Sequence, residues 1–137
     1  MKNVTLISCV SKKLNYESKA QDLYQSPLFK KSLAYARKIN SDKIYILSAK
    51  YGLVKLNDKI KPYDETLNKM SIFEKKKWAN EVFQKLQELE VISETNFIFL
   101  AGENYRKYLV EKLPYYEIPM KKLKIGEQLQ FLTEKLK

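Results

Sequence analysis

Residues 3–8 read NVTLIS, residues 42–48 read DKIYILS and residues 96–100 read NFIFL. Each is a short apolar run rich in β-branched and aromatic residues, and each predicts a strand that is buried on both faces. Helical patterns separate the runs. This alternation predicts an α/β fold, a single three-layer domain whose small, mainly parallel sheet of three or four strands carries helices on both faces. Residues 115–119 are the candidate for the fourth strand, at an edge.

Helix-start signals place the helices between these runs. Ser26 precedes Pro27, a pairing typical of an N-cap followed by the first helical turn, and apolar positions follow at helical spacing. Ser71 and Glu74 have the spacing of a capping box ahead of a long amphipathic helix. Its apolar face is expected to hold Ile72, Ala79, Val82, Phe83, Leu86 and Leu89. Further helices are expected around residues 20–25, 103–113 and 126–136.

Residues 49–69 show no clear period and contain several turn residues, so the sequence predicts a long loop. Ordered loops of this length inside small domains are often functional. Gly52, which follows the bulky Tyr51, is expected to adopt a positive φ or to lie too close to another group for a Cβ. The apolar pair Leu53–Val54 is expected to return to the core.

The composition limits the classes of protein. A chain of 137 residues fits one domain, residues 1–137, and 45% hydrophobic residues can form its core. No apolar run approaches the roughly 20 residues of a membrane span, and the short apolar start lacks the cleavage site of a signal peptide. Cys9 is the only cysteine, so a disulfide framework is excluded and a cytoplasmic location is expected.

The chain contains no histidine. A Ser-His-Asp triad, a Cys-His pair and any His-ligated metal site are therefore excluded within it. It also lacks a Walker motif and a GxGxxG motif, so nucleoside triphosphate and dinucleotide binding are not supported, and neither a metal nor a cofactor is expected.

The net charge is +10, which favours an anionic partner, nucleic acid first. Only Arg37 and Arg106 are arginine, although arginine is the favoured residue for bidentate phosphate contacts. A general bias toward lysine is the competing explanation of the charge, and it stays open at this point.

Small and polar residues follow each of the three predicted strands. Ligands of open parallel sheets bind beyond the carboxyl ends of the strands, so these residues and the long loop are expected to line one cleft. Strand ends also carry such residues as turns and helix caps, which is the alternative. The candidates for ligand binding are Ser8, Lys12, Ser48, Tyr51, Gly52, Tyr63, Tyr105 and Arg106. The candidates for catalysis are Cys9, Lys50 and Asp64.

For each candidate the sequence allows a functional role and an ordinary structural or solvated one. Cys9 could act as a nucleophile or be a buried structural cysteine. Lys12 and Lys50 could bind phosphate or transfer protons, or be solvated lysines. Asp64 could be a general base or cap a turn. Arg106, with the main-chain N–H groups at the start of its helix, could hold an anion.

Four segments carry a resemblance to a known family. Residues 46–67, ILSAKYGLVKLNDKIKPYDETL, resemble the signature of the YaaA-like peroxide-stress proteins, and residues 6–14, LISCVSKKL, resemble the start of the same family. Residues 100–106, LAGENYR, and residues 125–132, IGEQLQFL, resemble a set of bacterial and phage proteins of about this length without an assigned function. The first two segments place Ser8, Lys12, Ser48, Tyr51, Gly52, Pro62 and Tyr63 on matching positions.

The resemblance implies two functions. YaaA-like proteins are associated with protection against oxidative stress and with DNA binding, which implies that a basic cleft binds DNA or RNA. A more remote similarity to a domain of archaeosine synthase implies an enzyme that acts on a nucleobase, nucleoside or nucleotide, as a glycosidase or transferase. The first hypothesis predicts binding that weakens steeply with salt. The second predicts that alanine at Lys50 or Asp64 abolishes turnover and leaves the fold intact.

Overall fold

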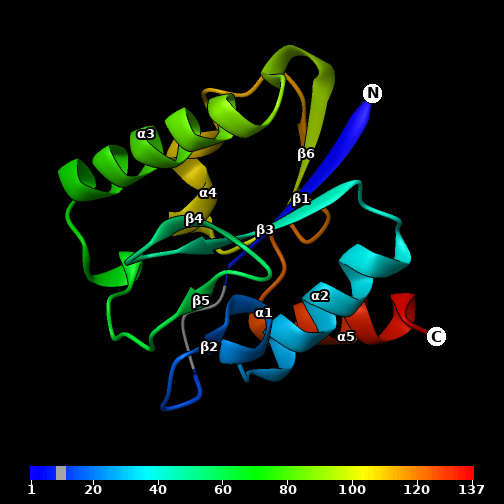
Figure 1. Cartoon of the computed structure of the whole chain (residues 1–137). Helices are drawn as coiled ribbons and strands as arrows, with labels where there is room; N and C mark the ends of the chain where they lie inside the picture. Colours follow the sequence, from blue (N-terminus) through cyan, green and yellow to red (C-terminus); the bar gives the residue numbers. More distant parts are fainter. Residues whose placement is uncertain (9–11) are drawn as a thin grey trace.

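The computed structural model describes residues 1–8 and 12–137, which fold around one five-stranded sheet (Figure 1). The spatial order of its strands is β4-β3-β1-β6-β7. The strands are β1 (Lys2–Ser8), β3 (Lys43–Ser48), β4 (Gly52–Lys55), β6 (Thr95–Leu100) and β7 (Tyr116–Glu117). The predicted α/β fold with a mainly parallel sheet is confirmed, but the sheet has five strands and not three or four.

Strand β1 lies at the centre of the sheet. It runs parallel to β3 on one side and to β6 on the other, so that Leu6 is opposite both Tyr45 and Phe99. All three of these side chains are buried. Helices cover both faces of such a strand, which is why the central strands read as almost continuous apolar runs. At the edges, β7 is parallel to β6 and β4 is antiparallel to β3.

The main helices form two pairs, one on each face of the sheet (Figure 1). Helices α2 (Pro27–Lys38) and α5 (Ile125–Lys135) make one pair, and the rings of Tyr35 and Phe131 meet between them at a centroid distance of 6.0 Å. Helices α3 (Ile72–Leu89) and α4 (Glu103–Val110) make the other. The predicted three layers are therefore confirmed.

Both predicted helix starts are confirmed. The Ser26 hydroxyl accepts a hydrogen bond from the Phe29 amide at 3.2 Å, and Pro27 opens α2. At the start of α3, Ser71 Oγ accepts from the Glu74 amide and Glu74 Oε1 accepts from the Ser71 amide, both at 3.1 Å. The prediction of the apolar face is wrong at one residue: Ile72 lies in the first turn of α3 and is 60% exposed. The buried face is formed by Trp78, Ala79, Val82 and Leu86.

The long loop predicted over residues 49–69 contains regular secondary structure. The chain turns at Gly52, whose φ is +72°, and returns along β3 as the edge strand β4. The predicted positive φ is thereby confirmed, as is the return of the now buried Leu53–Val54 pair to the core. Further on, β5 (Lys59–Ile60) pairs with β2 (Ser18–Lys19), and the 3₁₀ turn η1 (Leu67–Lys69) precedes α3. The strands are too short to show a period in the sequence.

Two shorter elements complete the fold. The short helix α1 (Ala20–Leu23) follows β2, and a second 3₁₀ turn, η2 (Ile92–Glu94), leads into β6. Among the described residues, none of the helices has the length and apolar character needed to cross a membrane.

Candidate functional site

The strand order defines one special position in the sheet, between β1 and β6. From β1 the chain passes through α2 to β3, on one side of β1. It then passes through α3 to β6, on the other side of β1, and through α4 to β7. The connections therefore diverge between β1 and β6, and in open α/β sheets ligands bind beyond the carboxyl ends of the strands at such a switch point.

A cavity of about 350 Å³ lies at this position, and we call it the switch-point pocket. Its floor includes Ser8 at the end of β1 and residues 100–102 at the end of β6. Its walls come from the first turns of α2 and α5 and from the start of α4, and they are mainly apolar. The wall residues include Leu28, Phe29, Tyr105, Met120, Ile125 and Leu129. Polar groups reach the pocket from Ser26, Ser32, Asn68 and Gln128.

A hydrogen bond joins the two strand ends below the pocket. Ser8 Oγ accepts from the Gly102 amide at 3.1 Å. A serine hydroxyl can also donate, and the Gln128 side chain, which donates to the Leu123 carbonyl at 2.9 Å, has an amide oxygen that can accept. The pocket thus combines apolar walls with a few hydrogen-bonding groups, as ligand pockets of this size usually do.

A second hollow of about 380 Å³ adjoins the switch-point pocket and shares Ala101, Gly102, Met120 and Gln128 with it. We call it the cationic hollow, because Arg106, Lys121 and Lys122 line it, with Glu103 as its one acidic residue. Arg106 Nη1 donates to the Ala101 carbonyl at 3.2 Å, which holds the guanidinium against the end of β6.

A third hollow, of about 500 Å³, lies between residues 12–15 and 62–64, and we call it the outer hollow. Lys13 Nζ is 4.6 Å from the centroid of the Tyr63 ring. The ring of Tyr51 meets that of Tyr63 edge-on at 5.6 Å, and Lys50 Nζ is 5.5 Å from the Tyr51 centroid. Two adjacent tyrosines, Tyr51 and Tyr63, are therefore flanked by lysines on both sides.

The predicted site residues divide among these places. Ser8 and Tyr105 line the switch-point pocket, and Arg106 lines the cationic hollow. Lys12, Tyr63 and Asp64 line the outer hollow, with Lys50 and Tyr51 beside it. All of them belong to the carboxyl end of the sheet, as expected, but they line separate hollows. Cys9 lies outside the described residues.

Buried contacts link Ser48 with Tyr105 beneath these hollows. Trp78 Nε1 donates to the Ser48 carbonyl at 2.9 Å, and the Trp78 ring meets the Tyr105 ring edge-on at 5.7 Å. Ser48 Oγ accepts from the Tyr51 amide at 3.0 Å, so Ser48 fixes the turn that leads to Gly52. Ser48 therefore has the structural role that was the alternative for strand-end residues.

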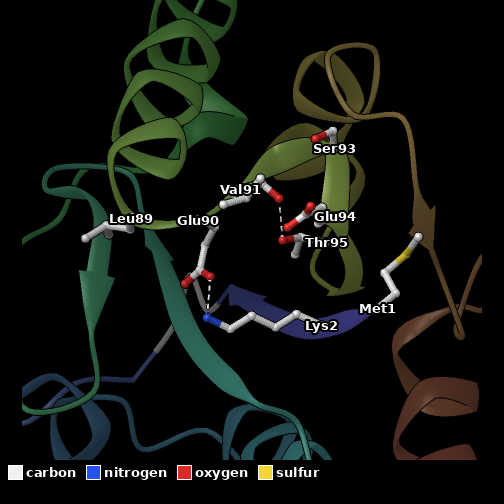
Figure 2. A pocket seen from close by; sticks show the side chains of 8 residues that line it. All are labelled: Met1, Lys2, Leu89, Glu90, Val91, Ser93, Glu94 and Thr95. Atoms are coloured by element: carbon white, nitrogen blue, oxygen red, sulfur yellow. Dashed lines mark hydrogen bonds and ion pairs between the residues drawn. The ribbon is translucent and has the colours of Figure 1, made fainter.

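A larger hollow, of about 570 Å³, lies at the opposite end of the sheet, where the strands begin (Figure 2). Its polar groups are used within the protein: Lys2 Nζ pairs with Glu90 Oε1 at 2.7 Å, and Thr95 Oγ1 donates to the Val91 carbonyl at 2.7 Å. Tyr45 donates its hydroxyl proton to the other oxygen of Glu90. Burial, together with this hydrogen bond and the carboxylate charge, raises the pKa of Tyr45. We interpret this cluster as structural.

Sequence reasoning missed several residues of the candidate site, namely Leu28, Phe29, Asn68, Lys121, Lys122, Gln128 and Leu129. The apolar ones occupy ordinary core positions of amphipathic helices. The Ser26–Pro27 helix start was a usable signal, because helices that follow parallel strands begin at the carboxyl end of the sheet.

Within residues 1–8 and 12–137, no group of three or more Cys, Asp or Glu residues is arranged to hold a metal ion. Comparisons with curated proteins and with solved structures gave no match. A comparison with protein-family models gave a match over residues 4–134, almost the whole chain. The chain therefore belongs to this family, which is described as a family of unknown function (DUF6884).

Proposed function

We propose that this chain binds a nucleotide unit, either free or as an unpaired residue of a DNA or RNA strand, in the switch-point pocket. The observation that carries the proposal is the cavity of about 350 Å³ at the divergence of β1 and β6. Its volume lies within the range of small-molecule sites, and its position is the one where open α/β sheets bind their ligands.

The lining suits the two parts of such a unit. The apolar walls, with Leu28 and Leu129, can enclose the faces of a flat base. Hydroxyl and amide groups of Ser8, Asn68 and Gln128 can donate to and accept from the polar edge of that base. A hydrophobic metabolite would leave these groups unpaired, which costs binding energy.

The electrostatics favour an anionic ligand. The first turns of α2 and α5 and the N-cap residue of α4, Gly102, border the pocket, and the amino ends of helices carry partial positive charge. The net charge of +10 acts in the same direction. The resemblance of residues 46–67 to YaaA-like proteins also supports a role connected with nucleic acids.

Equilibrium binding to the four nucleosides and their 5′-monophosphates, measured by calorimetry, tests the proposal. We expect at least one of these ligands to bind, and Leu129→Trp to abolish the binding because the larger side chain fills the pocket. Val91→Trp is the matched control, since Val91 is 59% exposed at the opposite end of the sheet. Absence of binding by all eight ligands, or unchanged binding in Leu129→Trp, would refute the proposal.

A second candidate function is the binding of a nucleic-acid strand along the outer hollow. It is supported by the packed rings of Tyr63 and Tyr51, which Lys13 and Lys50 flank. Single strands are held by cationic grooves with aromatic rings on which bases stack, and Tyr51 is 37% exposed. The two functions agree with each other if a strand crosses the outer hollow and inserts one base into the pocket.

A further inference from the structure

The cationic hollow combines three positive side chains with a position directly beside the switch-point pocket. The two spaces share four lining residues, Ala101, Gly102, Met120 and Gln128, so a ligand bound in one of them lies next to the other. We infer that the cationic hollow binds the phosphate of the ligand, so that the chain recognises a phosphorylated nucleotide and not a nucleoside or free base. This inference rests on the proposed function.

Arg106 is the first group that carries the inference. Its partly buried guanidinium donates to the Ala101 carbonyl, and within the described part of the chain it has no carboxylate within ion-pair distance. Guanidinium groups have five donors in a rigid fork that matches phosphate geometry. The one hydrogen bond fixes the direction of the fork and leaves the remaining donors for a phosphate.

The composition strengthens this assignment. The chain has 26 basic residues, and only Arg37 and Arg106 are arginine. Arg37 is exposed, and its Nη2 donates to Gln21 Oε1 at 2.9 Å. Of the two arginines, Arg106 is the one that lines a hollow described above, which is the place where a bidentate phosphate contact needs it.

Lys122 supplies a second, independent observation. It occupies the third position of the turn that the Leu123 amide closes on the Met120 carbonyl at 3.1 Å, and its φ is +71°. Glycine or asparagine normally takes this left-handed position, because a longer side chain is strained there. The chain nevertheless has a lysine at this position, with its side chain on the cationic hollow, which is the pattern of backbone strain retained at binding sites.

The test compares nucleosides with their 5′-monophosphates in calorimetry at fixed ionic strength. We expect the monophosphate to bind about tenfold tighter or more, the range of charge-assisted hydrogen bonds. Arg106→Gln should remove this difference and leave nucleoside affinity unchanged, and Arg106→Lys should keep part of it. Arg37→Gln is the matched control and should change neither affinity.

Lys122→Gly separates binding from folding. We expect it to raise the urea midpoint of unfolding, because the strain is relieved, and to weaken monophosphate binding severalfold. Equal binding of nucleoside and monophosphate, or a difference that survives Arg106→Gln, would overturn the inference but not the proposed function. If none of the nucleosides and monophosphates binds to the wild-type protein, the proposed function itself is refuted.

The phosphate can belong to a free nucleotide or to a strand. A single-stranded tetranucleotide that binds no tighter than the monophosphate identifies the free nucleotide as the ligand. Tighter binding of the tetranucleotide identifies a strand as the ligand. In either case, weaker binding of that ligand by Arg106→Gln supports a phosphate site in the cationic hollow.

Discussion

At Gly52 the backbone adopts a conformation that favours glycine. The residue has φ +72° and pairs with Ser48 across the turn between β3 and β4. A Cβ built there would meet Val82 Cγ2 at 3.8 Å, an ordinary van der Waals contact. Space is therefore available, and the requirement comes from the left-handed conformation alone.

We expect Gly52→Ala to lower the free energy of unfolding by about 1 kcal/mol, because alanine is strained at this φ. Gly126→Ala is the matched comparison. Gly126 lies in the first turn of α5 with no heavy atom within 4 Å of a Cβ, so alanine should stabilise the protein by about 0.5–1 kcal/mol through its higher helix propensity. Urea unfolding of both variants measures the two effects. Equal changes in both would contradict the conformational argument.

The sequence identified the residues at the strand ends but not what each one does. Ser48 was a candidate because it is polar and follows a strand, yet its hydroxyl fixes a turn and its carbonyl accepts from Trp78. A turn-forming serine and a ligand-binding serine have the same position in a linear pattern. Only the partner in space distinguishes them, and the partner of the Ser48 hydroxyl is the Tyr51 amide in the turn itself.

Three elements meet at Glu90, which follows the last residue of α3. Its buried carboxylate pairs with Lys2 of β1 and accepts the hydroxyl proton of Tyr45 of β3. A buried carboxylate needs such partners, because removing one leaves its charge uncompensated. This cluster therefore ties the end of α3 to the start of the sheet.

We expect Tyr45→Phe to lower the free energy of unfolding by about 2 kcal/mol at pH 7, the range for a hydrogen bond to a charged group. The raised pKa of Tyr45 adds a pH dependence: the folded protein keeps the phenol proton above pH 10.0, the ordinary value, where the unfolded chain loses it. The contribution of Tyr45 is thus complete below pH 10 and decreases at higher pH.

The difference between wild type and Tyr45→Phe should accordingly stay constant up to about pH 10 and shrink as the pH rises above it. Denaturant unfolding at several pH values measures it. Tyr115→Phe, at a tyrosine that is 46% exposed, is the control and should change little. A difference that grows with pH would have the wrong sign for this explanation.

The long elements were predictable from the sequence, because each has enough residues to show a period. The central strands have apolar runs, and α2 and α3 have start signals that the structure confirms. Strand β4 was missed because its four residues follow a tight turn and show no period. The switch-point pocket was missed for a related reason, since its walls are the first turns of helices whose apolar residues look like ordinary core.

At the scale of the whole molecule, the net charge of +10 has two explanations, a general lysine bias and a functional surface. The lysines occur in two kinds of places. Lys75, Lys76 and Lys77 form a run in the first turns of α3, and none of them lines the outer hollow. Lys12, Lys13 and Lys50 surround the tyrosines of the outer hollow.

Salt dependence separates the two explanations. For a single strand, the slope of the logarithm of the binding constant against the logarithm of salt concentration is about −0.7 for each phosphate that the protein neutralises. If the outer hollow binds the strand, alanine at Lys12, Lys13 and Lys50 together should reduce this slope by about 2. Alanine at Lys75, Lys76 and Lys77 removes the same charge and should leave the slope nearly unchanged. Fluorescence anisotropy with a labelled oligonucleotide between about 50 and 200 mM salt measures both variants. If both variants lower the slope equally, the strand responds to the overall charge, and the lysines that flank Tyr51 and Tyr63 at the outer hollow make no specific contribution to binding.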